Sequence, residues 1–88
     1  MTYTVLFSPT AIRDLERIPP RIVPAIVEFV YGDLAENPRR VGKALSRELE
    51  GRFSARRGPY RVIYTISDEH QTVGVLRVDH RADAYRPQ

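Results

Sequence analysis

The chain has 88 residues, a net charge of +3 from 14 Lys/Arg and 11 Asp/Glu, and no cysteine. This length predicts a single domain over residues 1–88, whose small core favours a site on an open face over a deep pocket. The lack of cysteine excludes a disulfide framework, a zinc finger and a thiol nucleophile. No apolar run approaches a membrane span, no secretion leader is visible, and His70 and His80 are poorly spaced for a metal site. We therefore expect a cytoplasmic protein with no membrane contact, no metal and no other cofactor.

The first part of the chain predicts a strand followed by two helices. Residues 3–8, YTVLFS, are rich in strand-forming side chains. Ser8 is a suitable N-cap and Pro9 suits the first position of a helix, after which apolar residues recur at helical spacing. Pro19-Pro20 ends this helix, and a second apolar stripe of helical period occupies residues 22 to about 37.

The second half of the chain changes to the alternation of period two that is typical of strands. Residues 36–52 connect the two halves as a loop with room for a short turn of helix. Turn signals at Gly58-Pro59 and over residues 67–71 divide the remainder into three strands. The expected order is β-α-α-β-β-β. We predict an α+β fold in which a two-helix hairpin packs on one face of a small, mainly antiparallel sheet.

The alternation in the three later strands assigns their side chains to two faces of the sheet. The more apolar set is expected beneath the helices and comprises Phe53, Ala55, Val62, Tyr64, Ile66, Leu76 and Val78. The opposite set, which includes Val75, is expected to stay open. It carries Arg52, Arg56, Arg61 and Arg77, with Arg81 added if the last strand extends that far. Guanidinium groups keep their charge and repel one another, so this cluster favours a polyanion or an acidic partner.

Positive charge is concentrated in the middle of the chain. Residues 39–61 hold eight Lys/Arg, Lys43 among them, against two Asp/Glu, whereas both flanking segments are net acidic. Such a block is typical of a surface that contacts nucleic acid or the ribosome. It could also be a solvated face whose arginines pair with nearby Asp or Glu, an alternative that composition leaves open.

The side chains available favour chemistry on RNA. Without a metal site, a cysteine or a Ser-His-Asp arrangement, hydrolysis of peptides or DNA has little support. RNA carries its own nucleophile, because its 2′-hydroxyl can attack the adjacent phosphate, and arginines suit the resulting phosphorane. Tyr85 is a candidate base if nearby arginines favour its phenolate, although it could instead stack on a nucleobase or tether the tail. His80 is a candidate acid, although the alternation also predicts a half-buried structural residue on the Leu76/Val78 side.

Two segments and the order of elements resemble a known family. The run LEGRFSARRGPYRVIYTI and the ending VLRVDHRADAYR are similar to the RelE branch of the RelE/ParE toxins of bacterial type II toxin–antitoxin modules. The resemblance implies a ribosome-dependent endoribonuclease that cleaves mRNA in the A site without a metal and so inhibits translation. It also implies a RelB-like antitoxin that neutralises the toxin, and a joint complex that binds operator DNA and represses its own operon.

The resemblance carries over to individual positions. The strand arginine of the family falls on Arg61, the late arginine on Arg81 and the C-terminal tyrosine on Tyr85. Its basic pair falls on Arg52 and on Ser54, so one cation is missing: either Arg56 replaces it or phosphate binding is weaker.

The family's usual account assigns the role of general base to the basic pair or the tyrosine and the role of general acid to the late arginine. A guanidinium is a reluctant acid, so we favour Arg81 as a charge stabiliser and His80 as a proton donor. The predicted site has catalytic Arg61, His80, Arg81 and Tyr85 and RNA-binding Lys43, Arg52, Arg56 and Arg77.

Two other functions fit the same fold. ParE-type toxins poison DNA gyrase and typically lack the arginine–tyrosine constellation, so Arg61, Arg81 and Tyr85 argue against that branch. A non-catalytic transcriptional co-repressor is the third hypothesis, and Ser54 in place of a cation keeps it open.

Overall fold

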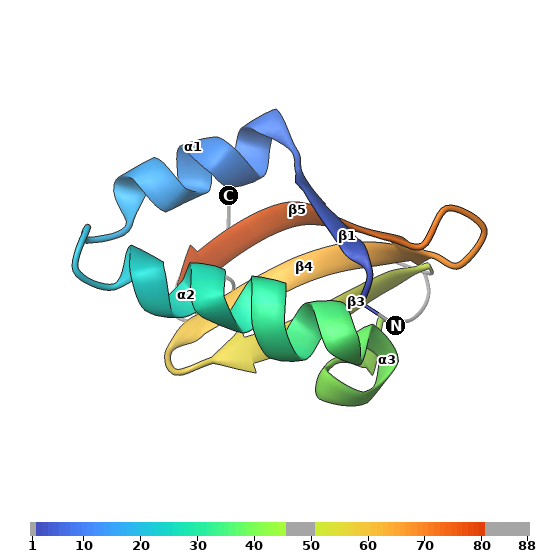
Figure 1. The fold of residues 1–88 in the computed structure, drawn as a ribbon. Coiled ribbons are helices and arrows are strands. Elements are labelled where there is room, and N and C mark those ends of the chain that lie inside the picture. The colour runs from blue at the N-terminus through green and yellow to red at the C-terminus, as the bar shows by residue number, and fades with distance from the viewer. Residues whose placement is uncertain (1, 46–50, 81–88) are drawn as a thin grey trace.

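The computed structural model describes residues 2–45 and 51–80 (Figure 1). Its main elements follow the predicted order. These are β1 (Thr4–Phe7), α1 (Pro9–Arg17), α2 (Val23–Phe29), β3 (Arg52–Arg57), β4 (Tyr60–Ser67) and β5 (Thr72–His80). The second predicted helix continues from α2 into a π-helical segment, η1 (Val30–Leu34), and the predicted turn of helix in the connection is α3 (Pro38–Val41). A two-residue strand, β2 (Lys43–Ala44), was not predicted.

The sheet has the order β1-β5-β4-β3-β2, in which β1 and β5 are parallel and the other pairs are antiparallel. Figure 1 shows α1 and α2 on the same side of this sheet, with α1 alongside β5. The α+β prediction of helices on one face of a mainly antiparallel sheet is therefore confirmed. We call the opposite side of the sheet the open face.

The first helix begins where the sequence indicates. The Ser8 hydroxyl accepts a hydrogen bond from the Ala11 N–H at 3.0 Å, and Pro9 occupies the first turn. The same hydroxyl donates to the Leu76 carbonyl of β5 at 2.9 Å, so the cap also fixes the helix to the sheet. The helix ends at Arg17 because the next residue has an extended backbone and is followed by Pro19-Pro20.

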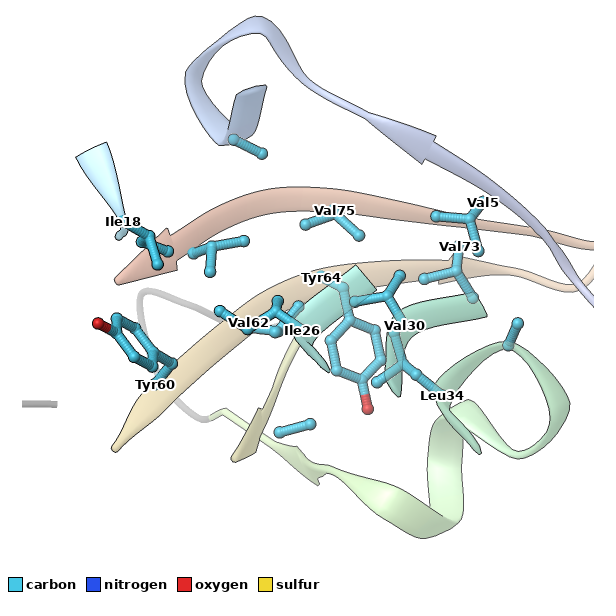
Figure 2. Close-up of a cluster of buried hydrophobic side chains, with 14 residues drawn as sticks. Val5, Ile18, Ile26, Val30, Leu34, Tyr60, Val62, Tyr64, Val73 and Val75 are labelled. Atoms are coloured by element: carbon cyan, nitrogen blue, oxygen red, sulfur yellow. The ribbon is translucent and has the colours of Figure 1, made fainter. Parts of the chain in front are cut away.

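The core lies between the helices and the sheet, and Tyr64 of β4 is its largest fully buried side chain (Figure 2). Its ring stacks on Phe53 with centroids 5.6 Å apart, and its hydroxyl donates to the carbonyl of Pro38, the first residue of α3. Burial raises the pKa of Tyr64 to about 12. One phenol therefore connects the sheet to the segment that leads into β2.

A β-bulge in β5 overturns part of the predicted alternation. Ile63 of β4 pairs with Arg77 and the next residue, Tyr64, pairs with Val75, so Leu76 is an extra residue. Val75 is fully buried beneath the helices and Leu76 is partly exposed. The prediction that Val75 faces the open side and Leu76 the core was wrong, because period two fails across a bulge. Val78, beyond the bulge, lies in the core as predicted.

We predict that Gly42→Ala destabilises the fold by about 1–3 kcal/mol. A Cβ atom at position 42 would lie 2.0 Å from the Tyr64 Oη and 2.9 Å from the Ser54 carbonyl oxygen, so the added methyl group must displace β2. The control is Gly32→Ala, where a Cβ atom meets nothing within 4 Å. Urea denaturation should show a loss for the first variant only, and equal stabilities would contradict the close packing of Gly42 on Tyr64.

We also predict that stability falls as pH rises from about 10 towards 12. The pKa of Tyr64 is raised from 10.0 to about 12 in the folded chain, so the unfolded state loses this proton first and is thereby stabilised relative to the native state. Tyr64→Phe should lack this component, while losing about 1–3 kcal/mol at pH 8 because the Pro38 carbonyl loses its donor. Chemical denaturation of both proteins across this pH range tests the difference.

Candidate functional site

A row of three charged residues crosses the open face on the three middle strands of the sheet, at the end next to the turn between β3 and β4. Arg56 of β3 stands opposite Arg61 of β4, and Arg61 stands opposite Asp79 of β5. Directly paired residues of antiparallel strands have their side chains on one face. Two adjacent guanidinium groups are thus balanced by a single carboxylate, and the row keeps a net positive charge.

Arg61 is held in this row with an incomplete set of partners. Its Nε atom lies 3.4 Å from the Asp79 Oδ1 atom, and the two side chains are 28% and 18% exposed. Within the part of the chain that the structure describes, both atoms are buried and have no hydrogen-bond partner. Polar atoms in this condition are rare in native structures and favour an additional ligand.

Two more predicted RNA contacts, Lys43 and Arg52, lie beside this row. Arg52 and Ser54 alternate with Arg56 along β3, and Lys43 of β2 pairs directly with Ser54. Lys43, Arg52 and Arg56 are exposed, and among residues 2–45 and 51–80 none of them forms an ion pair. The structure therefore brings Lys43, Arg52, Arg56 and Arg61 together, and the first three have no neutralising carboxylate in the described chain.

Arg77 has a different environment from the other predicted contacts. Its Nε atom donates to the Asp14 Oδ2 atom of α1 at 2.8 Å, and the same oxygen accepts the Val78 N–H at 2.9 Å. Asp14 is only 7% exposed, and its hydrogen bond raises the pKa of Arg77. RNA contact by Arg77 stays a prediction, but its guanidinium already has a structural partner in Asp14.

The end of β5 carries the predicted acid. His80 pairs with Tyr60, and the two rings meet edge to face with centroids 5.3 Å apart. Tyr60 belongs to the core, so His80 is partly buried on the helix side, as its parity predicted, while Arg61 faces the opposite side. Its catalytic role stays a prediction. Arg81 and Tyr85 lie outside the described residues.

Sequence reasoning did not single out the acids that neutralise other arginines. Arg39 donates two hydrogen bonds to Asp68, at 2.9 and 2.7 Å, and Tyr3 donates a third at 2.7 Å. These bonds lower the pKa of Asp68 and join α3 to the turn before β5. Arg39 and Asp68 are far apart in the sequence, and no sequence pattern links them. Only the structure shows that Arg39 is neutralised, unlike the cations of the open face.

Arg57 also lies apart from the cations of the open face. It lies at the end of β3 and lines a cavity of about 380 Å³ together with residues of α2 and η1, among them Glu28 and Asp33. This cavity is on the helix side of the sheet and does not include the Arg56–Arg61–Asp79 row.

Residues 2–45 and 51–80 carry neither a metal cluster nor a membrane-spanning helix. They contain no group of three His, Cys, Asp or Glu side chains arranged to hold a metal ion. None of their helices is long and apolar enough to cross a membrane.

Comparison with known proteins defines the class to which this fold and site belong. Residues 5–85 match the family described as the ParE toxin of the type II toxin–antitoxin system parDE. The chain therefore belongs to the RelE/ParE superfamily of type II toxin–antitoxin toxins, as its sequence motifs predicted.

Individual relatives are of the RelE type. Toxin RelG of Mycobacterium tuberculosis (strain ATCC 25618 / H37Rv) is 65% identical over 86 residues, 98% of this chain and 99% of that protein. Toxin RelE of the same strain is 50% identical over 84 residues, 96% of this chain and 87% of that protein. A crystal structure of the M. tuberculosis RelBE2 toxin–antitoxin complex has a TM-score of 0.89 at 63% identity, covering 92% of this chain and 100% of that chain. The isolated Escherichia coli RelE toxin, with a TM-score of 0.72 at 18% identity over 89% of this chain and 83% of that chain, shares the fold. This chain is a RelE-like toxin of a type II toxin–antitoxin system.

We predict that Asp14→Ala destabilises the chain by about 2–3 kcal/mol, because a buried N–H of β5 loses its charged acceptor. Asp14→Asn should lose about half as much, since an amide oxygen can still accept from Val78. Asp33→Ala removes an exposed carboxylate and should change stability by less than about 0.5 kcal/mol. Urea denaturation and hydrogen exchange at the Val78 amide measure these effects. A loss for Asp14→Ala no larger than that for Asp33→Ala would contradict the role assigned to this carboxylate.

Proposed function

We propose that this RelE-like toxin is an endoribonuclease that cleaves mRNA in the ribosomal A site without a metal ion and thereby stops translation. The observation that carries the proposal is the cation cluster of the open face. Lys43, Arg52, Arg56 and Arg61 lie on adjacent strands with Asp79 as their one carboxylate in the described chain. Such a surface binds and neutralises a chain of phosphates.

The reaction uses the nucleophile that RNA supplies. The 2′-oxygen attacks the adjacent phosphorus, the bond to the 5′-oxygen breaks, and the products are a 2′,3′-cyclic phosphate and a 5′-hydroxyl. Arg61 is the group that we assign to the phosphorane, because its fork matches phosphate oxygens and its charge is permanent. Its incomplete hydrogen bonding and its repulsion from Arg56 are both relieved by a dianionic transition state.

Two proton transfers complete the reaction. A base removes the proton of the 2′-hydroxyl, and we assign this role to Tyr85, with arginines stabilising its phenolate. An acid protonates the 5′-oxygen, and His80 is the candidate donor, with Arg81 as a charge stabiliser. The His80 ring contacts Tyr60 on the helix side, so as the acid it must meet the 5′-oxygen at the end of β5, beyond Asp79. With so few acid–base groups, the ribosome is expected to orient the 2′-hydroxyl for in-line attack.

The partners follow from the same surface. We infer a RelB-like cognate antitoxin whose acidic or amphipathic segment folds onto the toxin and neutralises its charge. Toxin–antitoxin complexes are the form in which the M. tuberculosis and E. coli RelBE proteins were crystallised. In this proposal the joint complex binds operator DNA through the antitoxin and regulates its own operon in the cytoplasm.

One competing function has support, because the matching family is described by the ParE toxin. A gyrase poison would leave mRNA on the ribosome intact and would be toxic through DNA damage. The cation cluster favours the ribonuclease, since a nuclease needs converging charge at one phosphate.

We predict that Arg61→Ala lowers A-site cleavage about 100-fold, the usual effect of removing one group that stabilises transition-state charge. The assay incubates the purified chain with programmed ribosomes, beside the same mRNA alone, and maps the new 5′ ends. Arg17→Ala is the matched control, because it removes one exposed arginine from α1 on the helix side.

The outcomes distinguish an endoribonuclease from a gyrase poison. Cleavage by the wild type and Arg17→Ala, and its loss in a folded Arg61→Ala variant, would support the proposal. A wild-type chain that is toxic in cells but leaves mRNA uncut in both tubes would overturn it and lead to assays on gyrase.

A further inference from the structure

The Asp79 carboxylate stands directly beside Arg61 in the row of charges on the open face. The two residues pair across β4 and β5, and the Arg61 Nε atom lies 3.4 Å from the Asp79 Oδ1 atom. The neighbouring Arg77 donates instead to Asp14, with its Nε atom 2.8 Å from that carboxylate. Asp79 is therefore the carboxylate that faces Arg61 within residues 2–45 and 51–80.

The two atoms that face each other are hidden from solvent. Arg61 Nε and Asp79 Oδ1 are both buried and have no hydrogen-bond partner in the described chain. Their separation of 3.4 Å exceeds the usual length of a charge-assisted hydrogen bond, which is about 2.7–2.9 Å. A shift of the guanidinium by about 0.5–0.7 Å, such as a bound anion induces, would satisfy both atoms at once.

This placement divides the donors of Arg61 into two groups. A guanidinium carries its N–H groups in one rigid plane, one on Nε and the others on the two Nη atoms. An acceptor at Nε fixes the direction of that plane and leaves the Nη donors for a second acceptor. Since Nε is buried while the side chain as a whole is 28% exposed, the edge toward Asp79 is not the part that solvent reaches.

A carboxylate beside this arginine opposes the proposed reaction by its charge. A phosphodiester carries one negative charge and its phosphorane carries two, so Asp79 repels both species and the phosphorane more strongly. Charge alone would therefore make Asp79 a disadvantage for binding and for cleavage. An accurately held guanidinium offsets this repulsion, because misplacing a catalytic group by about 1 Å can lower a rate about 100-fold.

We infer that Asp79 is a positioning residue, which accepts the Nε–H of Arg61 and so directs the Nη groups of that arginine toward the phosphorane. The inference rests on the proposed function, because it concerns how Arg61 acts in that reaction. It gives the two properties of Asp79 opposite effects: the negative charge weakens RNA binding, whereas the acceptor oxygen supports cleavage. Substitutions that remove these properties separately distinguish positioning from a merely structural role.

The first measurement is single-turnover cleavage of mRNA on programmed ribosomes with the full chain in excess. It gives a maximal rate and a half-saturating toxin concentration. Asp79→Ala removes charge and acceptor, and should lower the maximal rate about 10- to 100-fold while the half-saturating concentration falls about threefold. Asp79→Asn removes the charge alone, and should keep the maximal rate within about threefold of the wild type with the same fall in half-saturating concentration.

Asp33→Asn is the matched control, because it removes an exposed carboxylate of η1 and changes the net charge equally. It should leave both values unchanged. Thermal unfolding of each variant establishes that the chain is folded. Asp79→Leu has the shape of asparagine without its acceptor, and it replaces Asp79→Ala if the smaller side chain does not support the fold.

The second measurement needs no substrate, because NMR follows the exchange of the Arg61 Nε–H proton with water. In the wild type this exchange should be about tenfold slower than that of the exposed Arg17, and it should stay slow in Asp79→Asn. In Asp79→Ala it should approach the rate of Arg17. Equal exchange of Arg61 and Arg17 in the wild type, or slow exchange in Asp79→Ala, would overturn the inference.

The two measurements separate this inference from the proposed function. If the wild type cuts mRNA and a folded Asp79→Ala variant has the same maximal rate, the positioning role fails and the endoribonuclease stands. If the wild type cuts nothing and slow exchange depends on Asp79, the contact that positions Arg61 stands and the endoribonuclease fails. A parallel loss of rate and affinity in Asp79→Asn would also overturn the inference, because it would show that Asp79 acts through the fold.

Discussion

The buried phenol of Tyr64 connects the two layers of this molecule where the open face takes its shape. Its ring stacks on Phe53, its hydroxyl donates to the Pro38 carbonyl, and Gly42 crosses directly above it. A hydroxyl group in an apolar core needs a partner, so this bond selects the chain path that brings α3 over β4. Strand β2 follows from that path, and so does the position of Lys43. The contacts of Tyr64 therefore fix both the packing of the core and the position of the cation cluster.

Local patterns predicted the fold as far as local physics determines it. The Ser8 cap and the proline pair defined α1, and the alternation placed Val62 and Tyr64 under the helices. The same alternation failed at Leu76, because a bulge depends on how two strands pair and leaves no mark in the period of either one. Strand β2 was missed for a related reason, since two residues carry no period and its pairing depends on Gly42 fitting over Tyr64.

The sequence predicted the type of site, a phosphate-binding surface, better than it predicted which arginines belong to it. A block of positive charge indicated a phosphate-binding surface, but it could not separate Arg39, which Asp68 and Tyr3 neutralise, from Arg52 and Arg56, which face the open side. That distinction depends on contacts between distant parts of the chain. The proposed chemistry also depends on family resemblance, because charge and alternation alone describe many RNA-binding sheets.

Helix α1 has a consequence for how copies of this toxin meet. The pairing of β1 with β5 ends at Val75, and beyond it the Ser8 hydroxyl and the Asp14 carboxylate bind the Leu76 carbonyl and the Val78 N–H. Two side chains of one helix thus take the place of a neighbouring strand. A strand edge with unsatisfied backbone groups is a template for aggregation and domain swapping. Ser8 and Asp14 therefore also leave this edge with fewer free backbone groups for a strand of another molecule to pair with.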